Sequence, residues 1–428
     1  MNEKLTQSIT SFLKTQHEAQ TQFLAELVKV PSDNPPGDCQ RHAERTAELL
    51  EGLGLTVERH PVPQAMVQAN GMISATNLVV RHKFGEGPVI ALNAHGDVVP
   101  PGEGWTKQPF AAEVTDGWMY GRGVAVSKCD FVTYAWSLLA LKQAGVPLNG
   151  TIELHFTYDE EAGGNIGPGL LMREGISKPD LVISAGFSYG VVNAHNGCLH
   201  LEVQVDGKSA HAAAPYTGID ALEAAAHVLS TLYAWRKTLA RRVSAVTGIG
   251  SPQLTVGLIK GGINTNVVPD RVTFRLDRRM IPEERSGEVE AELVAVITGA
   301  AKAYPEARVT VRLILVVEPL TPIPAGRRLT DLLCQNATRI MGEKVEAKGV
   351  PLYTDAPHYA AVGIPVVLYG AGPHSIEEAN AHRADERLPL SDLYKATEVV
   401  ALTLAELLGG PFLAVPESHG SSSVSSRA

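Results

Sequence analysis

The chain has 428 residues, of which 44% are hydrophobic and 19% are charged, and it carries a formal net charge of −9 at pH 7. This length exceeds what one hydrophobic core usually supports, so we expect two domains. The acidic balance argues against a nucleic-acid partner. No apolar run is long enough to span a bilayer, and the N-terminus lacks a secretory pattern. We expect no membrane partner.

The cysteines give a second compositional signal. They lie far apart along the chain and form no paired motif: Cys39, Cys129, Cys198 and Cys334. A disulfide framework and a cysteine-based zinc site are both disfavoured by this spacing. A reducing compartment fits it, so we expect a cytoplasmic protein.

The first half of the chain alternates predicted helices with buried strands. Pro31 ends the first predicted helix, and Gly54 ends the second. Helices are expected over 5–30, 41–53 and 130–144, and strands over 55–59, 77–81, 89–94, 151–156 and 180–184. Alternation of this kind is typical of an α/β layer architecture.

The pattern changes after Gly197. Strands are predicted over 199–205, 253–260, 271–278 and 308–316, with helices over 220–239 and 286–304. The order β-α-β-β-α-β is the split βαβ plan. We therefore expect an inserted domain of the ferredoxin-like kind, and the chain divides into a first α/β part, the insertion, a second α/β part and a disordered, serine-rich tail: 1–197, 198–316, 317–414 and 415–428. Within the second α/β part we expect helices over 329–341 and 392–408 and a strand over 365–369.

Three adjacent carboxylates, Asp159, Glu160 and Glu161, directly follow the strand predicted over 151–156. Adjacent acids repel one another, so a divalent cation among them is favoured. Glu160 and Glu161 should point in different directions, so one can bind a metal while the other takes a proton from water. A solvated acidic loop is the structural alternative.

Two histidines supply further candidate ligands. His95 and Asp97 follow the strand predicted over 89–94, with a spacing that turns both side chains the same way. Asp97 can then hold the far nitrogen of His95 while the near nitrogen binds a metal. His382 lies in a predicted loop near the end of the chain. Each histidine alone also fits an ordinary strand end or a surface loop, whereas imidazoles and carboxylates together suit zinc or manganese.

Eight short segments occur in one order along nearly the whole chain: 31–37, 95–97, 121–123, 159–161, 209–211, 266–270, 354–356 and 381–382. In this order they resemble a family of metallopeptidases and deacylases. That family includes acetylornithine deacetylase, succinyl-diaminopimelate desuccinylase, carboxypeptidase G and aminoacylase. The resemblance implies a metallopeptidase-type α/β catalytic domain with a βαββαβ insertion that serves as a lid and as a dimerisation domain.

The resemblance also implies roles for residues at matching positions. His95, Glu161 and His382 would be metal ligands. Glu160 would be the general acid and base, and Asp97 would orient His95. These roles agree with the chemistry read from the residues themselves.

The inserted domain carries further implied roles. His211 would reach into the active site of a partner subunit and stabilise developing negative charge, so we expect a homo-oligomer. Asn266 and Arg278 would contact polar groups of the substrate. The alternative for His211 is a cap for the loop before the helix predicted over 220–239.

Substrate contacts are also expected from other residues. An arginine is favoured for a substrate carboxylate because it binds with two hydrogen bonds, and Arg278, Arg279 and Asn264 are the candidates. Aromatic side chains that could line a pocket are Phe187, Tyr189, Tyr353 and Tyr359. Each of these residues could instead pack or pair in the core.

Two carboxylates that the family usually carries are missing. Its bridging aspartate follows Gly-Arg-Gly by three residues, and Val126 stands there in this chain. A second acid should follow the strand predicted over 180–184, but the segment 185–190 contains none. Two ions about 3.5–4 Å apart need an anionic bridge. We therefore predict one weakly held divalent metal, manganese or zinc, per subunit, and Asp130 or His195 could replace a lost ligand.

With one metal, polarisation of a carbonyl must come from side chains such as His211 or Asn266. A substrate already activated towards attack by water needs less help. The variant segment 121–128 also resembles what a 5-nitroanthranilate aminohydrolase of this family would need. We predict a hydrolase of C–N bonds in small carboxylates, with the replacement of an aromatic amine by hydroxyl as the specific candidate. The alternatives are an N-acyl-amino-acid deacylase or dipeptidase, and a binding protein with a degraded metal site.

Overall fold

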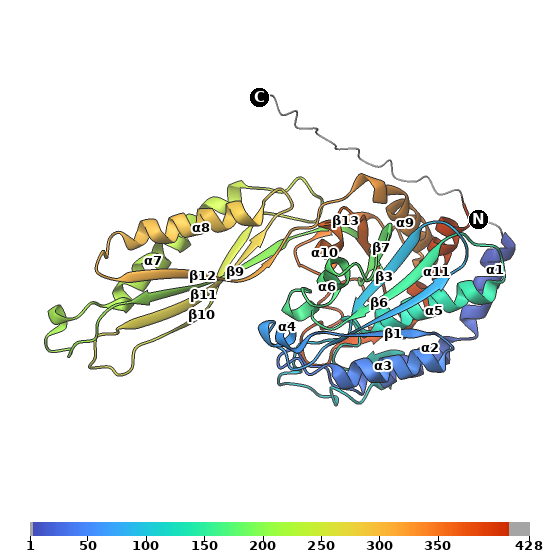
Figure 1. Cartoon of the computed structure of the whole chain (residues 1–428), viewed down its shortest axis with the longest axis horizontal. Helices are drawn as coiled ribbons and strands as arrows, with labels where there is room; N and C mark the ends of the chain where they lie inside the picture. Colours follow the sequence, from blue (N-terminus) through green and yellow to red (C-terminus); the bar gives the residue numbers. More distant parts are fainter. Residues whose placement is uncertain (1–2, 411–428) are drawn as a thin grey trace, which may run out of the picture.

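The computed structural model describes residues 3–410, which form a large lobe and a small lobe (Figure 1). The large lobe is built on an eight-stranded sheet with a small three-stranded sheet beside it, and the small lobe on a four-stranded sheet. The predicted α/β class with an inserted domain is confirmed. The disordered tail predicted over 415–428 lies outside the described residues. The domain limits stay a prediction.

Parallel strands fill the centre of the eight-stranded sheet. Its strands are β1 Val57–Pro61, β2 Thr76–Lys83, β3 Val89–His95, β6 Thr151–Thr157, β7 Leu181–Ser184, β8 Val191–His195, β13 Ala347–Val350 and β14 Val366–Leu368. They lie in the order β1-β2-β6-β3-β7-β14-β8-β13, and β6, β3, β7 and β14 run parallel. Layers on both faces bury these strands, which explains why they read as apolar runs.

Helices cover this sheet and form the main core with it (Figure 1). They are α1 Glu3–Lys14, α2 His17–Val28, α3 Gln40–Gly52, α4 Gln64–Ala69, α5 Lys128–Ala144, α6 Pro168–Arg173, α9 Arg327–Met341, α10 Ala356–Ala360 and α11 Leu390–Leu408. Most side chains of α5 and of α11 are buried, as expected for helices at the centre of a large lobe. In the part of the chain that the structure describes, no helix is long and apolar enough to cross a membrane.

The prediction of one helix over 5–30 was wrong. The segment forms α1 and α2, which are separated by Thr15 and Gln16. The Thr15 hydroxyl donates to the carbonyl of Phe12 at 2.7 Å. A threonine that binds the preceding turn in this way competes with continued helix, which explains the break.

The small lobe has the predicted β-α-β-β-α-β order. Its elements are β9 Gly197–Asp206, α7 Ala221–Arg236, β10 Gln253–Gly261, β11 Arg271–Met280, α8 Ser286–Ala301 and β12 Arg308–Val317. The strand order is β10-β11-β9-β12, with every neighbouring pair antiparallel, which is the ferredoxin-like arrangement. Helices α7 and α8 lie on one face of the sheet and share a core with it that is separate from that of the large lobe (Figure 1).

The large sheet brings two distant segments together. Strands β3 and β6 are parallel neighbours, and His95 pairs in register with Thr157. The residues that follow both strands therefore meet at one edge. Ligands commonly bind at the carboxyl ends of parallel strands, so this edge positions the candidate site.

Candidate active site

The three predicted metal ligands and Glu160, the predicted general acid and base, form two close pairs. His95 Nε2 lies 3.9 Å from Glu160 Oε2, and His382 Nε2 lies 3.3 Å from Glu161 Oε1. His95 ends β3, whereas Glu160 and Glu161 begin a short 3-10 helix after β6. His382 lies in the loop between β14 and β15 (Arg387–Pro389). Residues from three separate parts of the sequence thus gather at one edge of the sheet.

Asp97 is a buried carboxylate that fixes the acidic segment. It accepts hydrogen bonds from the backbone N–H groups of Glu160 at 3.2 Å and Glu161 at 3.1 Å, and from the Asn34 side chain at 2.9 Å. His95 Nδ1 lies 2.9 Å from the Asp97 carbonyl oxygen and 3.4 Å from its Oδ1. Because these contacts hold Nδ1, the other ring nitrogen of His95, Nε2, faces Glu160. This arrangement fits the predicted orienting role of Asp97.

Negative charge accumulates around these residues. Burial raises the pKa of Glu160 well above its usual value; His95 opposes this shift, and the charges of Glu161, Asp355 and Asp97 add to it. Burial, with repulsion from Asp97 and Glu161, also raises the pKa of Asp355 to about 7, against the opposing effect of His95. A divalent cation among these acids would relieve their repulsion. The carboxylates and imidazoles therefore fit a transition metal.

Asp355 received no role from the sequence, which used it only as part of an ordered motif. Its side chain is buried, and Oδ2 accepts a hydrogen bond from Thr157 at 3.4 Å. Oδ1 is buried with no hydrogen-bond partner within residues 3–410. The position of Asp355 just before α10 was the only available signal, because nothing in its spacing connects it to Glu160.

Glu386 is a second residue whose role the sequence did not show. Its carboxylate pairs with Arg122 and accepts hydrogen bonds from the backbone N–H groups of Ala125 at 3.0 Å and Val126 at 3.1 Å. The ion pair is buried on both sides. It ties the loop of His382 to the segment that contains Val126.

Val126 lies beside the candidate site. The next residue, Ser127, donates its hydroxyl hydrogen to the His95 carbonyl at 3.1 Å. The segment 185–190 starts at the same edge, where the Ala185 N–H donates to the carbonyl of Asn93 at 2.9 Å. Both positions without an acid are therefore close to the end of β3.

The two residues that could compensate are held by other groups. Asp130 Oδ1 accepts a hydrogen bond from the Ala371 N–H at 2.8 Å, and burial raises the pKa of Asp130 to about 8. His195 Nε2 lies 3.0 Å from the Thr354 hydroxyl, and burial lowers its pKa to about 4. Replacement of a lost ligand by either residue stays a prediction.

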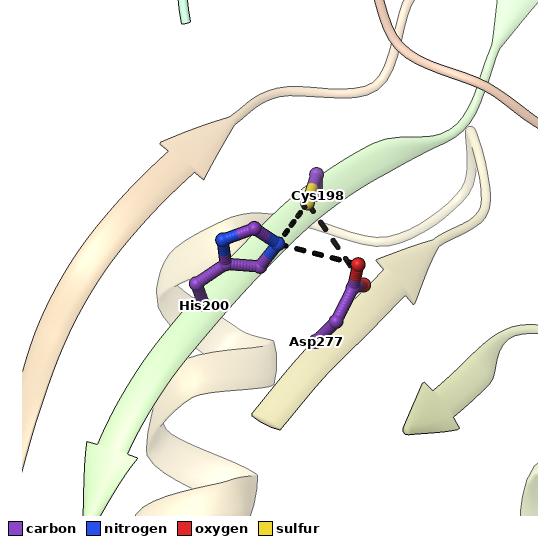
Figure 2. Close-up of side chains that lie close together, drawn as sticks. All are labelled: Cys198, His200 and Asp277. Carbon is purple, nitrogen blue, oxygen red and sulfur yellow. Dashed lines mark hydrogen bonds and ion pairs between the residues drawn. The ribbon is translucent and has the colours of Figure 1, made fainter. Parts of the chain in front are cut away.

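The predicted ligands do not converge on one point. Within residues 3–410, a single group of three ligand atoms lies within 4.8 Å of one another, and it consists of Cys198, His200 and Asp277 (Figure 2). This group is on β9 and β11 of the small lobe. No motif in the sequence indicates this group, because its residues become neighbours only when the strands pair.

The segment 207–220, which contains His211, and the segment 262–270, which contains Asn264 and Asn266, lie at the end of the small lobe that is far from the large lobe (Figure 1). All three are exposed, and Ala212 beside His211 donates its N–H to the Asn266 carbonyl at 3.0 Å. His211 Nδ1 accepts the Ala213 N–H at 3.1 Å. The lobe thus groups these residues, but one chain does not bring them to its own acidic site.

Arg278 and Arg279 have different surroundings. The Arg278 side chain is fully buried and forms an ion pair with Glu284 at 2.6 Å. The Arg279 guanidinium lies over the Tyr353 ring, 5.3 Å from its centroid. Burial raises the pKa of the Tyr353 phenol, and the negative charges of Glu160 and Glu161 add to this effect.

The other aromatic candidates pack elsewhere. Tyr359 is buried, and its hydroxyl lies 2.9 Å from His155 Nδ1. Tyr189 stacks on His374 and bonds to Asp392 at 3.1 Å. Phe187 packs against the main core.

The sequence profile of peptidase family M20/M25/M40 matches residues 91–406. The chain belongs to this family. The predicted resemblance is thereby confirmed, and members of the family are metal-dependent hydrolases. The chain is accordingly a hydrolase of the metallopeptidase type.

Individual family relatives cover most of the chain. An acetylornithine deacetylase from Edwardsiella ictaluri is 29% identical over 372 residues, which span 85% of this chain and 91% of the relative. The metallo-carboxypeptidase Sso-CP2 from Sulfolobus solfataricus superposes with a TM-score of 0.74 at 18% identity, covering 90% of this chain and 98% of that one. The YXEP protein of Bacillus subtilis, a dinuclear metal-binding peptidase, superposes with a TM-score of 0.63 at 19% identity. The match covers 92% of this chain and 99% of that one. The two solved structures show a shared fold.

Proposed function

We propose that this chain hydrolyses a C–N bond in a small carboxylate substrate with one labile divalent metal, manganese or zinc, per subunit. Glu161 and His382 would hold the ion, and His95 would be the further ligand. The observation that carries this proposal is the Glu161–His382 pair at 3.3 Å beside Glu160, with Val126 at the place of the bridging aspartate. When bound, the ion supplies Lewis acidity that favours formation of hydroxide from water.

Glu160 is the proposed general base and acid. Its backbone is fixed through Asp97, and its Oε2 faces His95 at the edge of the sheet. From this position Oε2 takes a proton from the attacking water and passes it to the departing nitrogen. Asp97 acts indirectly, because it holds both the His95 ring and the Glu160–Glu161 backbone.

Arg279 and Tyr353 are the proposed contacts for an aromatic carboxylate. The guanidinium can donate hydrogen bonds to the carboxylate, and the ring beneath it can pack against an aromatic substrate. Arg278 is the weaker candidate because its side chain is buried against Glu284. This arrangement supports an electron-poor aromatic amine, such as 5-nitroanthranilate, as the substrate.

The proposed reaction needs only water as the second reactant. The water oxygen bonds to the ring carbon that carries the amine, and the C–N bond breaks. The amine leaves as ammonia after it receives a proton, and hydroxyl remains on the ring. An electron-poor ring accepts the attack without a second ion to polarise it, which suits a site that lacks acids at Val126 and in the segment 185–190.

Deacylation is the second candidate. The relative from Edwardsiella ictaluri is an acetylornithine deacetylase, which favours an N-acyl amino acid as substrate. In that case the carbonyl must be polarised by side chains, and His211 or Asn266 of a partner subunit would do this. A binding protein without turnover is disfavoured, because binding alone would not require Glu160 or Asp97.

We also propose that two copies associate through the small lobe. His211, Asn264 and Asn266 are exposed at its far end. Apolar side chains near them are exposed as well, with Leu258 at 62%, Ile259 at 55% and Ile263 at 80%. Exposed apolar side chains on an edge strand and in the segment after it are available for a protein–protein contact.

Product analysis tests the proposed function. The full chain is supplied with Mn²⁺, Zn²⁺ or Co²⁺ and given either 5-nitroanthranilate or a set of N-acyl amino acids and dipeptides. We expect release of ammonia from the aromatic amine. Release of acetate or an amino acid instead would assign the deacylase or dipeptidase activity, and no turnover of any substrate would contradict the proposal.

A further inference from the structure

Three potential metal ligands of different chemistry meet on the open face of the small lobe. Cys198 and His200 are two residues apart on β9, so their side chains point to the same side of the sheet. Asp277 on β11 pairs directly with His200. The intervening Leu199 and its equivalents face α7 and α8 instead. Figure 2 shows the three side chains turned towards one another.

One ligand atom from each of the three residues lies within 4.8 Å of the others. His200 Nε2 lies 3.1 Å from Cys198 Sγ and 3.2 Å from Asp277 Oδ2, and the sulfur lies 3.9 Å from Asp277 Oδ1. Zinc bonds of about 2.3 Å to sulfur and about 2.0–2.2 Å to nitrogen and oxygen would place tetrahedral ligand atoms roughly 3.3–3.6 Å apart. The observed separations are close to these values.

A catalytic relay does not fit this geometry. In a relay the histidine uses one ring nitrogen for the nucleophile and the other for the acid. Here Cys198 and Asp277 both approach Nε2 of His200 (Figure 2). A single hydrogen on Nε2 cannot bond well to both, whereas one cation among the three atoms satisfies all of them.

The cluster also breaks the charge pattern of its own sheet face. Further along β9, Glu202 pairs with Arg275 and Arg312 on the two neighbouring strands. Asp206 is paired in the same way, with Arg271 and Arg308. Near the base of the lobe, a thiol and an imidazole take the place of the acid on β9. The sheet thus changes from ion pairs to potential metal ligands.

Arg279 donates hydrogen bonds to the carboxylate of Asp277 but is not itself a potential ligand. Its Nε donates to Asp277 Oδ1 at 3.0 Å and Oδ2 at 3.1 Å. Hydrogen bonds of this kind orient carboxylates that bind metals. Each carboxylate oxygen keeps a further lone pair, so the contact with Arg279 leaves Asp277 able to bind an ion.

We propose that Cys198, His200 and Asp277 bind one zinc-class transition ion, with a fourth position open to water. Sulfur, imidazole and carboxylate together select such an ion over magnesium or calcium. The site is distinct from the Glu161–His382 pair and does not depend on the proposed function. Arg279 connects it to the active-site side of the lobe, because the same guanidinium lies over Tyr353.

Cobalt titration of the chelator-treated full chain tests this site. Co²⁺ bound to a thiolate gives a charge-transfer absorption in the near ultraviolet, and the Glu161–His382 pair contains no thiol. We expect one equivalent of this absorption in the wild type, in Glu161→Ala/His382→Ala and in the matched control Cys334→Ser. We expect none in Cys198→Ser. His200→Gln should bind cobalt at least about tenfold more weakly, since even loss of an outer contact to a metal ligand costs about 10–100-fold.

The outcomes separate the two sites. Absence of the band in wild type at saturating cobalt would overturn this assignment, and so would a band that persists in Cys198→Ser. Loss of the band in the Glu161→Ala/His382→Ala variant would also overturn it, because the sites would not be independent. Circular dichroism of Cys198→Ser and His200→Gln distinguishes a lost ligand from a lost fold. Failure here, with turnover intact, would leave the proposed function standing.

Discussion

At the scale of single residues, Asp97 holds the backbone of the candidate site, and we propose that it does so without binding the metal. Its carboxylate receives hydrogen bonds from two backbone N–H groups and from Asn34, and it lies beside His95. Each proposed function of Glu160 and Glu161 depends on the backbone position that these bonds define. The site therefore depends on contacts beyond the atoms that would touch a metal.

Asp97→Asn tests this dependence. Each carboxylate oxygen of Asp97 accepts a backbone N–H, from Glu160 or Glu161. In the asparagine one oxygen is replaced by an NH₂ group, which cannot accept, so the Glu160–Glu161 segment should shift. We expect metal affinity and kcat/KM to fall by about 10–100-fold, as for other contacts that orient ligands. Asp331→Asn, at an exposed position on α9, is the control for loss of one charge. Wild-type metal affinity in Asp97→Asn would contradict the assignment.

Glu153 is a second buried acid, and its role concerns stability. Burial alone would raise its pKa, but His155, Ser177 and Arg81 lower it from 4.5 to about 2. Because the folded pKa lies below the unfolded one, the stabilisation is present above about pH 4.5 and is lost as the pH falls towards 2. Two to three pKa units correspond to about 3 kcal/mol at neutral pH.

Glu153→Gln should therefore lower the free energy of unfolding by up to about 3 kcal/mol at pH 7. The difference from wild type should be smaller by about 0.8 kcal/mol at pH 4, because the unfolded acid then binds protons. Urea unfolding at both pH values measures this. Glu86→Gln, at an exposed position, should leave the free energy of unfolding unchanged at both pH 7 and pH 4. A difference that grows on acidification would refute the assigned sign.

At the scale of elements, the apolar pattern identified strands β3, β6 and β7 because burial on both faces makes them continuous apolar runs. Short strands such as β8, β13 and those of the three-stranded sheet had no such signal. Their pairing depends on contacts far along the chain, as between β5 (Trp118–Tyr120) and β15. The split between α1 and α2 was missed because the hydrophobic pattern continues across Thr15.

The candidate site was predictable to a similar degree. His95, Glu160, Glu161 and His382 were found because they lie in motifs or directly after strands, and the structure brings them together in pairs. Asp355 and Glu386 were not assigned roles, because only the folded chain places them near the others. The group of Cys198, His200 and Asp277 could not be predicted for the same reason, since β9 and β11 are far apart in sequence.

Helix α11 allows a test at this scale. Leu404 is fully buried in it, at the centre of the core that supports the active-site edge. Leu404→Ala should destabilise the chain by about 2–5 kcal/mol, because it removes buried methyl groups and leaves a cavity. Leu222→Ala on α7, where the side chain is 48% exposed, is the matched control and should cost much less. Equal effects on thermal unfolding would contradict the assigned core.

At the scale of the whole molecule, the separation of the two lobes matters most. Each has its own core, and the segment 207–220 after β9, which contains the exposed His211, lies at the far end of the small lobe (Figure 1). One chain does not bring His211 to its own Glu160. If both residues serve catalysis at one site, a second copy of the chain must supply one of them. The proposed function would then require the proposed dimer.

Hybrid complementation tests this relation between copies. With a substrate whose turnover depends on His211, the His211→Ala and Glu160→Gln chains are each almost inactive alone, and they are mixed under conditions that exchange subunits. If His211 acts across the interface, each hybrid dimer contains one intact site, and activity should recover to about half of wild type per hybrid. If His211 acts within its own chain, no intact site forms. A mixture that remains inactive, with subunit exchange verified, would contradict the proposed arrangement.

The most direct test of the central claim measures metal binding and turnover of Glu160→Gln in parallel with wild type. The claim is that Glu161 and His382 hold the ion while Glu160 transfers the protons. We predict that Glu160→Gln binds Mn²⁺ within a few-fold of wild-type affinity but loses turnover by about 10²–10⁴-fold. Turnover at the wild-type rate in metal-loaded Glu160→Gln would contradict the account.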